Sequence, residues 1–122
     1  MKIFIIDIDG TICENIKNEE GIGRMRNARP LESSIEKINR LHEAGHYICF
    51  FTARRTEHER VTKDWLEKYG VRYHQLIMNK PRKLPPYVEY HFVDDSKVKA
   101  TTFKGKFTEF VKKKVDIEVF EE

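Results

Sequence analysis

Residues 3–15 read IFIIDIDGTICEN, and this stretch decides the fold class. Four consecutive apolar residues, 3–6, are typical of a strand buried on both faces in a parallel sheet covered by helices. Asp7 and Asp9 follow two positions apart on an extended chain, so they point to the same side and their charges repel. The stretch therefore predicts a buried strand whose end serves a cation or a reaction.

The rest of the chain alternates between helical spacing and apolar runs. Leu31 to Ala44 carry apolar residues at helical spacing and are followed by Gly45, which predicts a helix and its end. A second helix is expected from a capping box at Thr56 to Gly70. Three further strands are expected in HYICFFT (46–52), VRYHQLIM (71–78) and EYHFVDD (89–95).

This order predicts an α/β fold, a three-layer Rossmann-like open parallel sheet flanked by helices. The 122 residues are expected to form a single domain. Residues 14–30 show no clear period and predict a loop or flap. Residues 103–122 fit either a helix followed by a strand or a frayed end.

Composition narrows the class of protein. The 23 cationic residues are interleaved with 20 acidic ones, and the net charge is +3, so a nucleic-acid partner is unlikely on charge grounds. No apolar run approaches the roughly 20 residues of a membrane span, and no export signal is recognised. Cys13 and Cys49 form no CxxC pair and are expected to be buried thiols. We expect no membrane partner and a cytoplasmic location.

Polar side chains stand at the end of every predicted strand: Asp7 and Asp9, Thr52, Lys80, and Asp94 and Asp95. Ligands of open α/β sheets bind at the carboxyl ends of the strands. The sequence therefore predicts that four strand ends converge on one site.

The motifs DIDGT, FTAR, NKP and FVDDS, in that order, resemble the haloacid dehalogenase (HAD) superfamily of phosphatases over residues 3 to about 100. The resemblance implies an HAD-like fold in which Asp7 is the nucleophile that forms an aspartyl-phosphate. It implies that Asp9 protonates the leaving oxygen and then deprotonates water. Halide-displacing members lack the second aspartate, so a phosphatase or phosphotransferase is expected and not a dehalogenase.

The resemblance also implies a Mg²⁺ cofactor. Asp7, the backbone carbonyl of Asp9 and one acid of VDDS would supply oxygen ligands, which Mg²⁺ prefers. The family pattern favours Asp95 as the direct ligand and Asp94 as its outer partner.

Cations and hydroxyls would hold the phosphoryl group. Lys80 is expected to contact it and to keep Asp7 ionised, with Lys83 as the alternative. The hydroxyl of Thr52 matches the family position that binds the transferred group. Further donors are expected from the backbone N–H groups of Gly10, Thr11 and Ala53.

Substrate selection is less constrained by the motifs. No cap domain is recognised, so a lid formed by residues 14–30, or the neighbouring subunit of a homo-oligomer, would cover the site. Arg24, Arg26 and Arg29 in this flap, and Arg54 after the second strand, are candidate substrate contacts or else solvated charges.

The motif arrangement is similar to small HAD proteins of bacterial surface-polysaccharide biosynthesis, which implies a small phosphorylated metabolite such as a sugar- or polyol-phosphate. A polynucleotide-end or other macromolecular phosphatase is the alternative. A receiver-like phospho-aspartate signalling domain is a second one, but its phosphoacceptor follows a middle strand and Asp9 would have no role.

Overall fold

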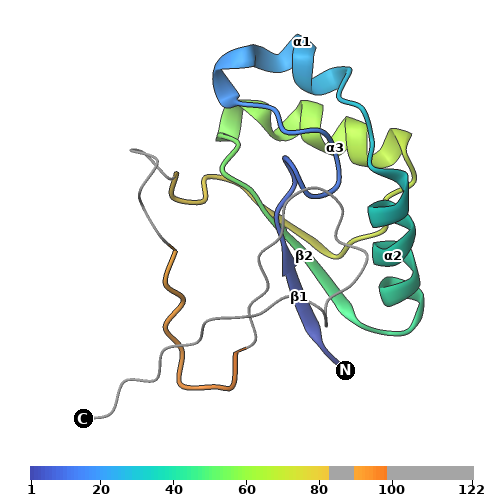
Figure 1. The fold of residues 1–122 in the computed structure, drawn as a ribbon, viewed down its shortest axis with the longest axis vertical. Helices are drawn as coiled ribbons and strands as arrows, with labels where there is room; N and C mark the ends of the chain where they lie inside the picture. The colour runs from blue at the N-terminus through green and yellow to red at the C-terminus, as the bar shows by residue number, and fades with distance from the viewer. Residues whose placement is uncertain (83–89, 99–122) are drawn as a thin grey trace.

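The computed structural model describes residues 1–82 and 90–98 of the chain. Three parallel strands form one sheet in the order β1 (Ile3–Ile6), β2 (Tyr47–Phe51) and β3 (Gln75–Ile77). Helix α2 (Glu32–Glu43) connects the first two strands, and η2 (Thr56–His58) with α3 (Glu59–Lys68) connects the next two (Figure 1). The predicted α/β Rossmann-like class is confirmed.

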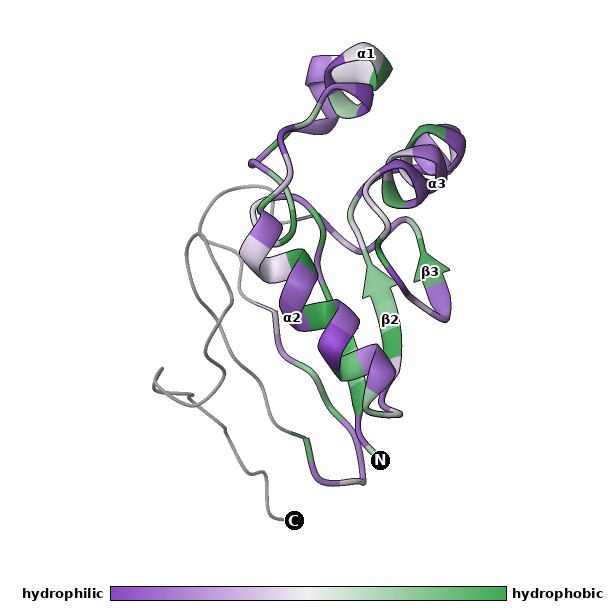
Figure 2. Ribbon diagram, turned by 90° about the vertical axis from the view of Figure 1, so that its right-hand side faces the viewer, coloured by the Kyte–Doolittle hydropathy of each residue, from purple (hydrophilic) through white to green (hydrophobic). Residues whose placement is uncertain are grey.

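The core lies between one face of the sheet and the helices. Ile6, Phe50 and Leu76 share a row across the three strands, and Phe4 and Ile48 lie two positions earlier on the same face. All five belong to or pack against the buried cluster that includes Ile38 of α2. Figure 2 shows β2 mainly green, whereas α2 mixes purple and green along its length, as expected for a helix with one apolar face.

The opposite face of β1 is open, so the expected burial on both faces is wrong for this strand. Ile3 is 64% exposed and Ile5 is 65% exposed. Right-handed crossovers that advance in one direction across a sheet place both helices on the same face. A helical layer on the second face is not found within residues 1–82 and 90–98.

The strand expected over 89–95 is also wrong for the residues described. No strand is formed over 90–98, and Phe92 and Val93 are 61% and 84% exposed. An apolar run becomes a strand only when it pairs with a neighbour, and here the Asp94 carboxylate instead accepts the N–H of Ser96 at 2.9 Å in a local bend. The expectations for 103–122 and Lys83 lie outside the described residues.

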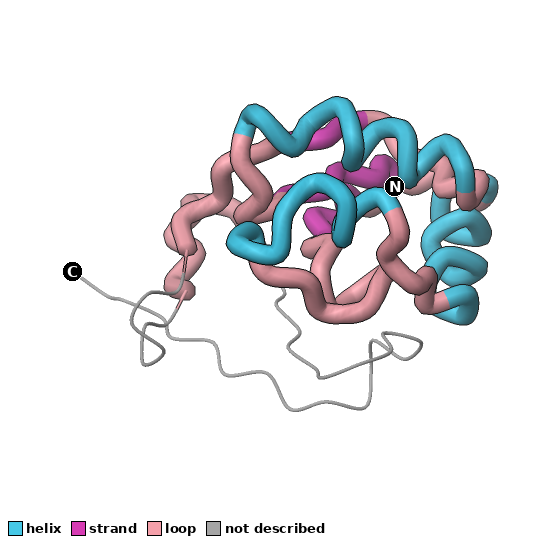
Figure 3. The backbone as a smooth tube through the Cα atoms, turned by 90° about the horizontal axis from the view of Figure 1, so that it is seen from above, coloured by secondary structure: helices cyan, strands magenta, loops and turns pink. Residues whose placement is uncertain are grey.

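Residues 14–30, expected as a loop or flap, contain η1 (Asn18–Glu20) and α1 (Gly21–Arg26) and belong partly to the core. Met25 and Ala28 are fully buried, and the indole N–H of Trp65 donates to the Ala28 carbonyl at 2.9 Å. In Figure 1, α1 lies beside α3 at the carboxyl ends of the strands, and Figure 3 looks down on this end. Only part of this segment is therefore available to move as a lid.

Met25→Ala tests this attachment. Met25 has no exposed surface, so the variant is expected to lose about 2–5 kcal/mol of unfolding free energy in urea denaturation. Ile22→Ala, on the same short helix but 42% exposed, is the matched control and should lose less than about 1 kcal/mol. Equal and small losses for both variants would mean that α1 is not anchored in the core.

Two smaller expectations concern the thiols and the membrane. Cys13 and Cys49 are both buried and free, as predicted. Among the described residues, no helix combines the length and the apolar character needed to cross a membrane.

Candidate active site

A cavity of about 280 Å³ opens at the carboxyl ends of β1 and β2. It takes two residues from the end of β1, three from the following loop and four from the segments after β2 and β3. Its lining residues are Asp7, Asp9, Ile16, Lys17, Asn18, Ala53, Lys80, Arg82 and Tyr90. Asp7 and Asp9 after β1, Ala53 after β2 and Lys80 after β3, all predicted for the site, are therefore brought together.

The Asp7 carboxylate is held by one of its two oxygens. Its Oδ1 accepts the N–H of Ile8 at 2.8 Å and lies 3.2 Å from the ammonium of Lys80. In the part of the chain that the structure describes, no hydrogen bond reaches Oδ2. Burial raises the pKa of Asp7, and the charge of Lys80 acts against this rise. The arrangement leaves one carboxylate oxygen available beside a fixed cation.

The chain around Asn79 directs Lys80 toward Asp7. Asn79 adopts a left-handed conformation (φ 65°), which asparagine tolerates better than most residues. Its N–H donates to the carbonyl of Arg54 at 2.7 Å, and its side chain hydrogen-bonds Thr56. The N–H of Lys80 then donates to the carbonyl of Thr52 at 2.8 Å. These bonds fix the strand-end loop that carries the lysine.

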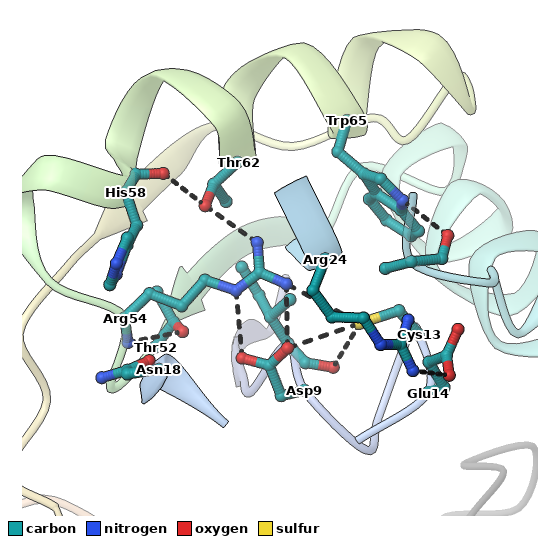
Figure 4. Close-up of polar contacts among 12 residues, drawn as sticks. Asp9, Cys13, Glu14, Asn18, Arg24, Thr52, Arg54, His58, Thr62 and Trp65 are labelled. Carbon is teal, nitrogen blue, oxygen red and sulfur yellow. Dashed lines mark hydrogen bonds and ion pairs between the residues drawn. The ribbon is translucent and has the colours of Figure 1, made fainter. Parts of the chain in front are cut away.

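Asp9 forms an ion pair with Arg54, whose side chain is 1% exposed. Arg54 Nη2 donates to Asp9 Oδ1 at 2.8 Å, and Nε donates to Oδ2 at 3.0 Å. Arg54 Nη1 donates to the hydroxyl of Thr62 at 3.0 Å, which donates in turn to the carbonyl of His58 at 2.8 Å (Figure 4). This two-pronged contact sets the position of the Asp9 carboxylate.

The expected substrate contact of Arg54 therefore remains a prediction without a contact to the cavity. Its guanidinium does not line the cavity, because its donors are used by Asp9 and Thr62. Sequence reasoning missed this buried pair, since nothing in the pattern of FTARR distinguishes an inward arginine from an outward one.

Cys13 lies beside the same pair, with its Sγ 3.6 Å from Asp9 Oδ1. Burial, reinforced by the charge of Asp9, raises the pKa of the thiol to about 12. Cys13 is therefore a neutral thiol at neutral pH and a poor nucleophile.

The expected phosphoryl donors are not assembled in this structure. Thr52 is fully buried, and its hydroxyl accepts the N–H of Arg54 at 3.1 Å. The N–H groups of Gly10 and Thr11 donate to the carbonyls of Cys13 and Ile8, each at 3.0 Å, in the turn after β1. Gly10 has a φ of +80°, which favours glycine there. Thr52, Gly10 and Thr11 lie outside the cavity lining, so their binding roles remain predictions.

The flap arginines also lie outside the lining. Arg24 forms an ion pair with Glu14, whose second oxygen accepts the N–H of Arg29 at 2.6 Å. The hydrogen bond from Arg24 is the largest cause that lowers the pKa of Glu14 to about 2. Arg26 is exposed. Substrate binding by Arg24, Arg26 and Arg29 remains a prediction without a contact to the cavity.

Five lining residues were missed by sequence reasoning: Ile16, Lys17, Asn18, Arg82 and Tyr90. The Asn18 amide donates to the carbonyl of Ala53 at 2.9 Å, which joins the loop after β1 to the loop after β2. The ammonium of Lys80 lies 5.2 Å from the ring centre of Tyr90. The only signal was proximity in the sequence, because Lys17 and Asn18 follow the DIDGT motif and Arg82 follows Lys80.

The predicted metal ligands are only partly brought together. Asp7 and Asp9 line the cavity, whereas Asp94 and Asp95 do not, and the described residues contain no group of three His, Cys, Asp or Glu side chains suited to a metal. Two carboxylates at one opening, one of them with a free oxygen, still fit the preference of Mg²⁺ for few carboxylates plus water and phosphate oxygens. The ligand roles of Asp94 and Asp95 remain predictions.

A larger hollow of about 500 Å³ lies along α2 between residues such as Glu36, Arg40 and Arg72. It contains none of the residues predicted for the site. The chemistry is therefore sought in the first cavity.

Comparison with protein families gives one matching model, described as the polynucleotide kinase PNKP phosphatase domain of the HAD type, over residues 1–115. No curated protein sequence matches the chain.

Three solved structures illustrate the fold. A protein from Vibrio cholerae is similar at 25% identity, with a TM-score of 0.58 over 80% of this chain and 83% of that one. A chain of the Pnkp1/Rnl/Hen1 complex is similar at 19% identity, with a TM-score of 0.56 over 68% of this chain and 30% of that one. D,D-heptose 1,7-bisphosphate phosphatase from B. bronchiseptica, complexed with magnesium and phosphate, is similar at 19% identity. The TM-score is 0.51 over 72% of this chain and 54% of that one.

Proposed function

The chain belongs to the family of polynucleotide kinase PNKP phosphatase domains and is an HAD-type phosphoric monoester hydrolase, and from that premise we propose a Mg²⁺-dependent reaction through a phospho-aspartate on Asp7. The observation that carries the proposal is the open Oδ2 of Asp7 beside the Lys80 ammonium, which lies 3.2 Å from Oδ1. A carboxylate in this setting is ready for attack and has a cation beside it for the phosphoryl oxygens.

In the first step, Asp7 Oδ2 attacks phosphorus and the bond from phosphorus to the leaving oxygen breaks. Asp9 in its acid form gives its proton to that oxygen. In the second step, water attacks phosphorus, Asp9 takes its proton, and the bond to Asp7 breaks. Arg54 holds both oxygens of Asp9 and so fixes the carboxyl group that transfers this proton.

We assign the Mg²⁺ ion to Asp7 and the backbone carbonyl of Asp9, with Asp95 as a further ligand. When bound, the ion supplies positive charge against two anions that repel each other, the nucleophile and the phosphate. Burial already disfavours the charge on Asp7, and Lys80 compensates only part of this penalty, which supports the need for a second cation.

The substrate is proposed to be a small phosphorylated metabolite, because the cavity of about 280 Å³ is at the lower end for small-molecule sites. The family match favours a second candidate, the phosphorylated end of a polynucleotide, and it weakens the expectation that a nucleic-acid partner is unlikely.

Phosphate release from p-nitrophenyl phosphate tests the proposed reaction. We expect turnover with Mg²⁺, nearly complete loss with a chelator, and recovery when Mg²⁺ is added in excess. Mn²⁺ should also support activity, because oxygen ligands discriminate weakly between these ions. Activity that is unchanged by the chelator would contradict the metal requirement, and a panel of sugar phosphates and 3′-phosphorylated oligonucleotides would decide between the substrates.

A further inference from the structure

Two cations of the cavity have no part in the proposed chemistry. Of the charged lining residues, Asp7 pairs with Lys80, and Asp9 pairs with Arg54 behind the cavity. Lys17 and Arg82 remain, one from the loop after β1 and the other two positions beyond Lys80. They line the same cavity from segments far apart in sequence, so the fold places them at one opening.

Their charges are incompletely compensated. Arg82 donates to Glu19 Oε1 at 2.5 Å, whereas no carboxylate in the described ranges lies within ion-pair distance of the Lys17 ammonium. The hydrogen bond from Arg82 is the largest cause that lowers the pKa of Glu19, and the charge of Lys17 contributes as well. Glu19 forms an ion pair with Arg82 and none with Lys17, so the three groups together leave one net positive charge.

Glu19 itself is outside the cavity lining and mostly exposed, with 62% of its side chain accessible. An ion pair whose acid is this exposed, with Arg82 itself 28% accessible, is weak and can be displaced by a phosphate that both cations contact. A ligand anion in the cavity can therefore take over donors of Arg82 while Lys17 approaches it from the other loop.

The loop that carries Lys17 is held in place. The Asn18 amide donates to the Ala53 carbonyl, and the N–H of Lys17 donates to Glu20 at 2.6 Å. Ile16, immediately before Lys17, is buried in the core. The position of this cation is therefore set by the fold, although its side chain is exposed.

We propose that Lys17 and Arg82 form a subsite for a second phosphoryl group on the leaving part of the substrate. This inference rests on the proposed function and defines the substrate class: a monoester whose leaving group carries another phosphate. That phosphate is either the second group of a bisphosphorylated metabolite or the internucleotide diester beside a phosphorylated oligonucleotide end.

Matched substrate pairs test the subsite and separate the two sources. One pair is fructose 1,6-bisphosphate and fructose 6-phosphate; the other is a dinucleotide 3′-phosphate and a nucleoside 3′-monophosphate. In the pair that fits the subsite, the substrate with the second phosphate should have a kcat/KM at least about tenfold higher than the substrate without it. The difference should come mainly from a lower KM. Preference in the first pair identifies a metabolite, and preference in the second identifies an oligonucleotide.

Lys17→Gln and Arg82→Gln should each reduce that preference about tenfold, and added salt should weaken it. Glu19→Gln should increase it, because the substitution removes the carboxylate that neutralises Arg82. Lys63→Gln and Arg60→Gln, exposed on α3, are matched controls that should leave the preference unchanged. Lack of preference in both pairs, or equal losses on both members of a pair, would overturn the subsite.

Binding gives the same comparison without turnover. Calorimetric titration of the Asp7→Asn protein with each pair, with and without Lys17→Gln, should show the affinity difference even if hydrolysis fails. A phosphatase that hydrolyses p-nitrophenyl phosphate but shows neither preference would refute the subsite alone, whereas binding preference without any hydrolysis would refute the proposed reaction alone.

Discussion

Replacing Asp7 by asparagine is expected to lower kcat for phosphate monoesters by about three orders of magnitude or more. The amide cannot act as the nucleophile, so the covalent step is lost. The fold should remain, because the asparagine oxygen can still accept the N–H of Ile8, which lies 2.8 Å from Asp7 Oδ1. Burial raises the pKa of Asp7, so removing its charge removes a desolvation penalty that offsets the lost pairing with Lys80, and the unfolding free energy should change by less than about 1 kcal/mol.

Initial rates on p-nitrophenyl phosphate and urea denaturation of the same preparation measure the two effects. Asp64→Asn, an exposed carboxylate on α3 that pairs with Arg60, is the control and should change neither quantity appreciably. Residual turnover of the Asp7→Asn protein within about tenfold of the unchanged protein would mean that another group attacks phosphorus.

The second large effect concerns Arg54. Arg54→Met leaves the Asp9 carboxylate, whose side chain is only 14% exposed, without the two hydrogen bonds that Arg54 donates. Removing one partner of a buried ion pair costs about 3–5 kcal/mol of unfolding free energy. Arg60→Met, an exposed arginine on α3, should cost less than about 1 kcal/mol and serves as the matched control.

A double-mutant cycle isolates the pair. Asp9→Asn alone leaves the Arg54 charge buried without a counter-charge, whereas Asp9→Asn with Arg54→Met removes both charges. The double variant should therefore be more stable than the sum of the two single losses predicts, by about 2 kcal/mol. Additive losses in urea denaturation would show that the two side chains do not stabilise each other.

Arg54→Lys separates position from charge. The lysine keeps a cation but offers no planar fork to both oxygens of Asp9. Since Arg54 touches Asp9 and not the cavity, the variant should lower kcat with little change in KM for p-nitrophenyl phosphate.

The sequence predicted the helices and strands in which the apolar residues recur at a regular spacing within a short segment. The helical spacing that ends at Gly45 corresponds to α2, and Gly45 has a φ of +92° that favours glycine there. The apolar runs before Asp7 and Thr52 correspond to β1 and β2. Because parallel strands end at one edge of the sheet, the same reasoning brought Asp7, Asp9 and Lys80 into one cavity.

What the sequence could not predict depends on partners far along the chain. The run that includes Phe92 and Val93 has strand-like composition, but composition does not supply the neighbouring strand that would hold it. FTARR contains two adjacent arginines, and only the position of Thr62 on α3 and of Asp9 after β1 determines that Arg54 points inward. Lys17 and Arg82 resemble ordinary surface cations until the fold places both at the opening.

Identifying the residue that carries the phosphoryl group tests the central claim most directly. The Asp9→Asn substitution should slow hydrolysis of the phospho-aspartate intermediate, because no base activates the attacking water. Mixing this variant with p-nitrophenyl phosphate and Mg²⁺, quenching rapidly and sequencing peptides 3–17 and 90–98 by mass spectrometry should locate one phosphoryl group on Asp7. A phosphoryl group on Asp94 or Asp95, or an unlabelled protein during active turnover, would contradict the assignment of Asp7 as the nucleophile.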